Sequence, residues 1–192
     1  MKQFLYSNAA KMILTKLQNF FNKKSIFPME VKIEGTVAVY DGGKKVSEVS
    51  FVANFDEIEI LETVAKERGK GYASTAVENA LKFAKFFGKI KISCPYVKKW
   101  IEKNGFDKSV EFTKVLRFKE AIERFNKYRS PEANAKIVEI DHKKALVEIS
   151  GPFCTSCGIF DYFEDIAVEA NAKILEYKEV ENGFRVTYLL GD

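Results

Sequence analysis

Cysteine, proline and histidine are scarce in this 192-residue sequence, which contains three cysteines, four prolines and one histidine. A small and odd number of cysteines argues against a secreted scaffold held together by disulfides. No uncharged apolar run approaches the ~18–20 residues that a membrane span requires. The first residues also lack the apolar core and small-residue cleavage site of a signal peptide. We therefore expect a cytoplasmic protein without a membrane partner.

A dense basic tract is also missing. The lysines are spread along the chain rather than interleaved with stacking aromatics, so nucleic acid is not an expected partner. The net charge of +4 is divided unevenly, because residues 1–117 hold 21 basic and 13 acidic side chains, whereas residues 118–192 hold 10 and 14. This division favours two units, of which the first suits an anion, although ordinary surface variation would produce it as well.

Hydrophobic periodicity predicts the order of elements in residues 1–117. It indicates a helix at 8–22, strands at 36–40, 46–52 and 57–64, a helix from 73 to about 88, a strand at 89–93, a helix at 96–104 and a strand at 110–116. The first two strands flank Asp41-Gly42-Gly43, which is a hairpin signal. The mixture of strands and helices predicts the α/β (α+β) class.

Residues 118–192 are expected to form a second, small α+β domain. A helix at 118–128 is broken by Ser130-Pro131, and a hairpin follows at 136–140 and 145–150. A further helix runs to about Asn171, and two strands at 173–180 and 184–190 complete the chain. No repeat of 20–50 residues is expected.

Two glycines stand between basic residues in Arg68-Gly69-Lys70-Gly71, where the third strand ends and a helix begins. The first N–H groups of a helix have no partners inside it, and the helix dipole makes that end positive. Glycines would let an anion approach this backbone, and Arg68 and Lys70 add positive charge. The combination is typical of a phosphate or pyrophosphate site, although a kinked turn with solvated basic residues would give the same short motif.

The surrounding residues carry a family resemblance. Residues 68–73 fit the pattern Arg/Gln-x-x-Gly-x-Gly/Ala, Val64 stands four residues before it, and 100–106 reads WIEKNGF, a short helix closed by Gly-Phe. Together, roughly residues 30–117 resemble the GNAT superfamily of acetyl-CoA-dependent N-acetyltransferases. The resemblance implies a mixed, mainly antiparallel GNAT-like sheet with flanking helices. It also implies two partners, namely acetyl-CoA and an amine on a protein or a small molecule.

The same resemblance implies which residues bind the coenzyme. The strand that ends at Val64 would offer backbone to the pantetheine arm, and the amides of the loop would hold the pyrophosphate. The loop residues are Arg68, Gly69, Lys70, Gly71, Tyr72 and Ala73.

Two residues are candidates for the chemistry. Cys94-Pro95-Tyr96-Val97 resembles a segment of the minimal GNAT-like proteins, and this implies that Cys94 lies near the acetyl thioester as nucleophile, proton donor or wall. Strand alternation predicts that Glu62 shares a face with Ile58, Ile60 and Val64, close to the coenzyme, so Glu62 is the candidate base.

Other polar groups rank lower for this role. Glu59 is expected on the opposite face of the strand from Glu62. Many GNATs have a tyrosine where this chain has Ile101, so that acid is missing, and Tyr72 and Tyr96 are alternative phenols that we expect to be structural.

Cys154 and Cys157 form a Cys-x-x-Cys pair between a strand and a helix start. The pair suits a redox couple or half of a zinc or iron–sulfur site completed by a second subunit in a homodimer, and packed thiols are the remaining alternative. His142 is expected to be solvated in a hairpin tip. The arrangement weakly resembles the NifU-like scaffold domain. It leaves open an alternative function, a thiol-redox or metal-binding protein whose GNAT-like half only binds coenzyme A.

Overall fold

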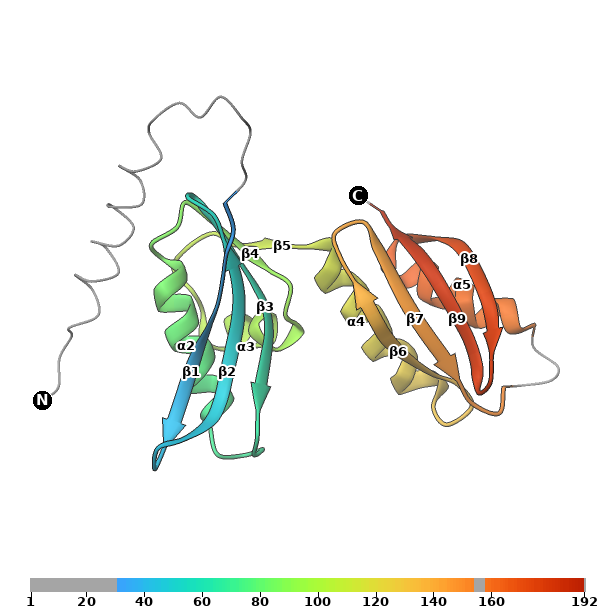
Figure 1. Cartoon of the computed structure of the whole chain (residues 1–192), viewed down its shortest axis with the longest axis horizontal. Helices are drawn as coiled ribbons and strands as arrows, with labels where there is room; N and C mark the ends of the chain where they lie inside the picture. The colour runs from blue at the N-terminus through green and yellow to red at the C-terminus, as the bar shows by residue number, and fades with distance from the viewer. Residues whose placement is uncertain (1–30, 154–157, 192) are drawn as a thin grey trace, which may run out of the picture. The chain divides into compact units, whose positions relative to one another are not determined.

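The structure is a computed structural model that describes residues 31–153 and 158–191 (Figure 1). It divides into two compact units. The first contains the described residues up to 92 together with 99–111, and the second contains 93–98 together with the described residues from 112 onward. The helix predicted at 8–22 lies outside the described residues.

The first unit is built on a mixed sheet with the strand order β1-β2-β3-β4-β5. Neighbours among β1, β2 and β3 are antiparallel, and β3 pairs with β4 in parallel. The sheet therefore has the mainly antiparallel character that the sequence predicts. The strands of the sheet are β1 (Ile33–Asp41), β2 (Lys44–Ala53), β3 (Glu57–Ala65), β4 (Lys89–Ile92) and β5 (Glu111–Phe112). The unit contains helix α2 (Tyr72–Ala84) and the part of α3 (Pro95–Asn104) from residue 99 onward, whereas residues 95–98 of α3 belong to the second unit.

Helix α2 packs its small-residue face on this sheet. Phe83 of α2 contacts Phe51 of β2, with their ring centroids 5.2 Å apart. Small side chains allow the helix backbone to approach the strands closely. The apolar spacing of the sequence predicts a buried face of Ala73, Val77, Ala80, Leu81 and Ala84, of which Ala73 is only half-buried, and it omits Ala76. The buried residues of the helix are Ala76, Val77, Ala80, Leu81 and Ala84.

The strand predicted at 110–116 is wrong over most of its length. Only Glu111 and Phe112 form a strand, and α4 (Lys114–Arg129) begins two residues later. Thr113 caps this helix, because its side chain accepts a hydrogen bond from the N–H of Leu116 at 3.2 Å. Such a cap contributes about 1 kcal/mol. Helix α4 therefore extends across the boundary predicted at residue 117.

The second unit is a four-stranded antiparallel sheet with the order β6-β7-β9-β8. Helices α4 and α5 lie behind the strands in Figure 1 and share one apolar core with them. Phe118, Phe163 and Tyr188 are fully buried there, and burial raises the pKa of the Tyr188 hydroxyl strongly. The remaining elements are β6 (Asn134–Ile140), β7 (Lys144–Ser150), α5 (Ile159–Ala170), β8 (Ala172–Val180) and β9 (Gly183–Leu190).

An internal repeat organises the second unit, contrary to the sequence expectation. The order helix, strand, strand occurs twice, and residues 132–139 (EANAKIVE) recur as 169–176 (EANAKILE). Each copy has an irregularity at the same point of its edge strand, between Ile137 and Glu139 and between Ile174 and Glu176. Leu146 of β7 pairs with Thr187 of β9, and the registers of the two hairpins make these two residues equivalent, since Leu146 is opposite Glu139 and Thr187 is opposite Glu176. The two halves are therefore related by a pseudo-twofold axis near that pair.

The junction between the halves depends on a close backbone approach at Gly183. Its φ is +147°, and a Cβ added there would lie 2.0 Å from the carbonyl oxygen of Ile149. We expect Gly183→Ala to lower the free energy of unfolding of this unit by about 2 kcal/mol or more, because backbone would have to move. Denaturant unfolding monitored by circular dichroism measures the change.

Gly43→Ala is the matched control for left-handed backbone without crowding, because Gly43 has a φ of +78° and open space around its Cβ position. Its cost should stay near 1 kcal/mol. Equal stabilities for the two variants would contradict the crowding at Gly183.

Candidate functional site

The glycine loop joins β3 to α2, and both of its glycines have left-handed backbone. Gly69 has a φ of +79° and Gly71 a φ of +78°, and a Cβ added at either residue would meet nothing within 4 Å. The backbone conformation therefore requires glycine here, and the surrounding space does not. The open space also leaves the loop backbone accessible to a ligand.

The N-terminus of α2 is chemically suited to an anion. Gly71 is the N-cap and supplies no side-chain cap, and the first turn contains no acidic residue. Inside the helix the N–H of Thr75 bonds to the Gly71 carbonyl at 3.0 Å, whereas the preceding N–H groups have no acceptor four residues earlier. These donors and the helix dipole favour negative charge at the loop.

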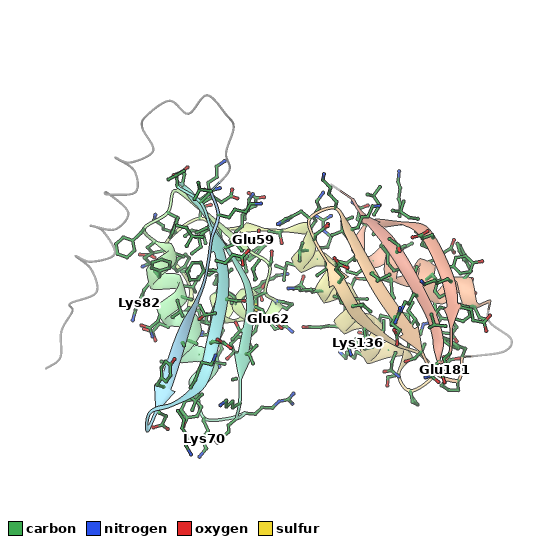
Figure 2. The ribbon with its side chains drawn as sticks, in the orientation of Figure 1. Glu59, Glu62, Lys70, Lys82, Lys136 and Glu181 are labelled. Atoms are coloured by element: carbon green, nitrogen blue, oxygen red, sulfur yellow. The ribbon has the colours of Figure 1, made fainter. Side chains whose placement is uncertain are left out.

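Arg68 and Lys70 are both exposed in this loop. Within the described part of the chain, neither side chain is engaged in an ion pair. Figure 2 shows Lys70 beyond the end of β3. Two exposed cations outside any ion pair of the described residues thus lie in the loop before the helix start.

Tyr72 anchors the start of α2. Its hydroxyl donates a 2.5 Å hydrogen bond to Asp41, at the turn between β1 and β2. This hydrogen bond, with a smaller contribution from desolvation, raises the pKa of the Tyr72 phenol above its ordinary value of 10.0. The expectation that this phenol has a structural role is consistent with the contact.

Strand β3 continues beyond its parallel partner. Pairing with β4 ends at Ile60 and Ile92, whereas β3 runs on to Ala65. The carbonyl of Val64 accepts a 2.9 Å hydrogen bond from the hydroxyl of Ser47 on β2, so this carbonyl faces β2, the antiparallel neighbour of β3. The part of β3 predicted to meet the pantetheine arm is therefore the part that β4 does not pair with.

The predicted face of Glu62 is wrong, because β3 contains a bulge. Glu62 is opposite Ser50 and Ile60 is opposite Phe51, so one extra residue, Leu61, lies between them on β3. Since neighbouring residues of β2 point to opposite faces, Glu62 and Ile60 also point to opposite faces.

The bulge places Glu62 and Glu59 on the same side of the sheet, away from α2. Glu59 is opposite Val52, which shares the face of Ser50. The two glutamates differ in exposure, because Glu62 is exposed and Glu59 is only 9% exposed. Both are labelled on β3 in Figure 2.

A lysine on β4 balances part of this acidic face. Lys91 forms a 2.9 Å ion pair with Glu57, and this hydrogen bond, supported by the charges of Glu111 and Glu59, raises the pKa of the lysine. Glu59 is in register with the same lysine. Glu62 lies farther along the strand and is the more accessible carboxylate.

Cys94 stands two residues after the end of β4 and is buried, with 4% exposure. Its sulfur is not part of a disulfide. Its carbonyl accepts a hydrogen bond from the N–H of Lys98 at 3.2 Å, which opens α3. Tyr96, one of the alternative phenols, is 42% exposed on that helix.

Helix α3 is attached to the first turn of α2. Trp100 donates a 2.7 Å hydrogen bond from its indole nitrogen to the Ser74 hydroxyl. Gly105, with a φ of +76°, closes α3 as predicted, and its N–H bonds to the Ile101 carbonyl at 2.8 Å. The short helix and Gly-Phe inferred from WIEKNGF are thus confirmed.

Cys154 and Cys157, the predicted metal or redox pair, lie outside the described residues. Among residues 31–153 and 158–191, no group of three or more His, Cys, Asp and Glu side chains could hold a metal ion. His142 is exposed in the turn between β6 and β7. No helix in the described ranges is long and apolar enough to cross a membrane.

Comparison with known proteins agrees with the geometry of the first unit. Residues 36–109 match the model of a family described as GCN5-related N-acetyl-transferase. The matched segment includes the bulged strand β3, the glycine loop and all of α3, and it supports an acyltransferase-type function. No curated protein and no solved structure matches the chain. The match does not extend to residues 118–192, so the NifU-like resemblance has no support.

The contact between Tyr72 and Asp41 predicts a titration. We expect Asp41→Asn to lower the pKa of Tyr72 towards 10, because the phenol no longer donates to a carboxylate. Since the pKa is raised in the folded state, the hydrogen bond stabilises the fold fully below the unfolded value and is lost as the pH rises through the folded value. Carbon-13 NMR of labelled tyrosine between about pH 8 and 12 follows the change.

Asp107→Asn is the control for a general charge effect, because Asp107 pairs with Lys85 at 2.6 Å and has no contact with Tyr72. The pKa of Tyr72 should fall in Asp41→Asn and should stay at its wild-type value in Asp107→Asn. Identical titration of Tyr72 in the wild-type protein and Asp41→Asn would rule out the hydrogen bond.

Proposed function

We propose that the first unit is an acetyl-CoA-dependent N-acetyltransferase that acts on an amine of a protein or a small molecule. One observation carries the proposal: the left-handed glycine loop, with the cations Arg68 and Lys70, starts α2 without an acidic residue in its first turn, within the segment that matches the acetyltransferase family. Backbone donors at a helix start together with two cations suit a pyrophosphate.

In this proposal the coenzyme follows β3. The pyrophosphate binds the amides of residues 69–73, with Arg68 and Lys70 beside it. The pantetheine arm lies along the part of β3 near Val64, past the last residue paired with β4. An arm that adds amide contacts to a strand uses backbone geometry for affinity, as a β-strand ligand does.

Glu62 is the proposed base. The acceptor is an ammonium ion at neutral pH and must lose a proton before its nitrogen can attack the thioester carbonyl. Glu62 is exposed on the face of the sheet that α2 does not cover. Its carboxylate attracts the ammonium group electrostatically and accepts the proton directly or through a water molecule.

Cys94 is the proposed partner of the leaving group. The amine nitrogen forms a bond to the acetyl carbon, the carbon–sulfur bond breaks, and the coenzyme leaves as a thiolate. The Cys94 thiol donates its proton to that thiolate and is reprotonated by solvent. An acetyl group detected on Cys94 by mass spectrometry would instead assign the thiol as a nucleophile.

Coenzyme binding is tested by Gly71→Glu. A carboxylate at this position repels the pyrophosphate and obstructs the amides, so acetyl-CoA affinity should fall by about 10-fold or more. Isothermal titration calorimetry measures the dissociation constant.

Gly105→Glu is a matched control, since Gly105 and Gly71 have φ values of +76° and +78° and open space around the Cβ position. The same backbone strain and charge are then introduced after the last turn of α3, away from the loop. Unchanged affinity in a folded Gly71→Glu protein would refute the loop assignment.

The base is tested by Glu62→Gln. We expect kcat to fall by about 100-fold and the acidic limb of the pH–rate profile to disappear, because the amide cannot accept the proton. Glu34→Gln is the control, because Glu34 is exposed on β1 opposite Val52 and therefore shares the face of Glu62. If Glu62→Gln has the same kcat and the same pH–rate profile as Glu34→Gln, Glu62 is not the base.

A further inference from the structure

The segment that carries Cys94 is held by side chains of α4. Ser93 is fully buried, and its hydroxyl shares a 2.6 Å hydrogen bond with the hydroxyl of Thr113, the N-cap of α4. Lys119, one turn and a half into α4, donates from its Nζ to the Ser93 carbonyl at 3.1 Å. The residue before Cys94 is therefore fixed through its side chain and its backbone.

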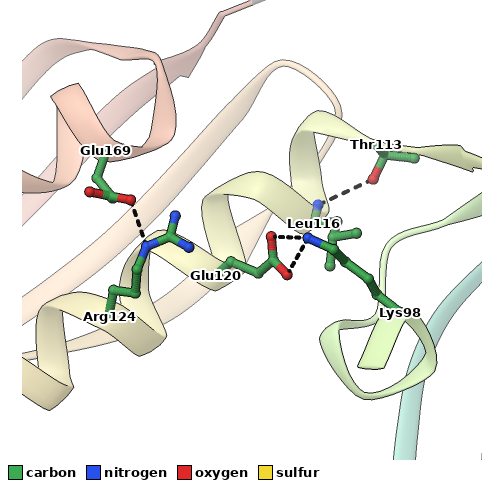
Figure 3. Close-up of polar contacts among 6 residues, drawn as sticks. All are labelled: Lys98, Thr113, Leu116, Glu120, Arg124 and Glu169. Carbon is green, nitrogen blue, oxygen red and sulfur yellow. Dashed lines mark hydrogen bonds and ion pairs between the residues drawn. The ribbon is translucent and has the colours of Figure 1, made fainter. Parts of the chain in front are cut away.

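A second contact fixes the residues after Cys94. Lys98, whose N–H bonds to the Cys94 carbonyl, donates to both carboxylate oxygens of Glu120 at 2.9 and 3.0 Å (Figure 3). The two side chains are 26% and 17% exposed. Lys98 also lies over the Phe112 ring, 5.5 Å from its centroid. Cys94 is thus restrained from both sides along the chain by one helix.

Helix α4 is itself attached to α5. Arg124 and Glu169 form a 2.5 Å ion pair, visible in Figure 3, and Arg129 pairs with Asp165. These pairs are exposed and individually weak. They continue one line of contacts from the Cys94 segment through α4 to α5.

The chemistry of the contact to Ser93 indicates a role beyond packing. Ser93 and Thr113 are among the few buried polar residues of the described chain, with 0% and 7% exposure. Two apolar side chains of similar shape would fill the same space with little loss of stability, whereas a hydrogen-bonded pair admits one geometry. Reacting groups require placement to within a fraction of an ångström.

We propose that α4 positions Cys94, with Ser93, Thr113 and Glu120 as positioning residues for acyl transfer. The proposal rests on the proposed function for its consequence in catalysis, but the placement of the thiol can be measured without acetyl-CoA. It assigns to α4 a direct part in arranging the cysteine of the same unit.

The test is the rate at which iodoacetamide alkylates Cys94, read at that residue by peptide mass spectrometry between about pH 6 and 10. Ser93→Ala and Glu120→Gln should each speed alkylation about fivefold, the factor that loss of one hydrogen bond adds to a local opening equilibrium. Thr113→Ser keeps the hydroxyl and should retain the wild-type rate. Glu169→Gln breaks only the ion pair with Arg124, so it should also leave the alkylation rate of Cys94 at the wild-type value.

Turnover provides the second readout. Ser93→Ala and Glu120→Gln should lower kcat about 10-fold and leave the KM for acetyl-CoA unchanged, because the 68–73 loop is untouched. Wild-type alkylation rates in both variants would overturn the proposal. If Ser93→Ala does not fold, Glu120→Gln decides alone, since the Glu120 side chain is partly exposed and glutamine has nearly the same shape.

Failure of the proposed function has a different signature. The wild-type protein would then neither bind acetyl-CoA in calorimetry nor be protected from alkylation at Cys94 by it. The alkylation rates of the variants would still support or overturn the positioning of the thiol by α4.

Discussion

The end of the β3–β4 pairing at Ile60 and Ile92 is the constraint on which the candidate site depends. Beyond this point β3 bulges at Leu61, turns Glu62 to the face away from α2 and leads into the glycine loop. On the other strand the chain leaves β4 and reaches Cys94 after two residues. A bulge that re-aims a side chain beside a site is a common use of this irregularity. One local departure from regular pairing therefore precedes the proposed base, the proposed coenzyme loop and the proposed thiol along the chain.

The features that could be predicted from sequence are those with a local physical signal. Gly69 and Gly71 required left-handed backbone, and the small residues of α2 marked its buried face. The face of Glu62 could not be predicted, because strict alternation of side chains along a strand does not allow for the extra residue of a bulge. The strand predicted at 110–116 is wrong because the strand period was assigned to residues whose burial follows the helix period. Val115, Phe118, Ile122 and Phe125 are buried at helical spacing, but β-branched and aromatic residues around Thr113 favoured a strand. The repeat was missed although eight residues carry it almost unchanged, since the flanking helices share little sequence.

The contacts made by α4 connect two features that lie apart in the sequence, namely the start of this helix and the segment around Cys94. Its N-cap, Thr113, serves the Leu116 amide and Ser93 at once, so the helix start and the placement of the Cys94 segment depend on the same hydroxyl. Buried polar groups of this kind restrict a protein to one arrangement at some cost in desolvation. Their presence beside Cys94, among buried residues that are mostly apolar, is the reason to assign α4 a role beyond packing.

The pseudo-twofold symmetry has a topological consequence for the second unit. By symmetry, the end of β9 and the start of α4 are equivalent to the end of β7 at Ser150 and the start of α5 at Ile159. Each half contributes one helix and two strands to a single apolar core. Neither half can therefore bury its apolar face without the other, and the two copies form one folding unit rather than two.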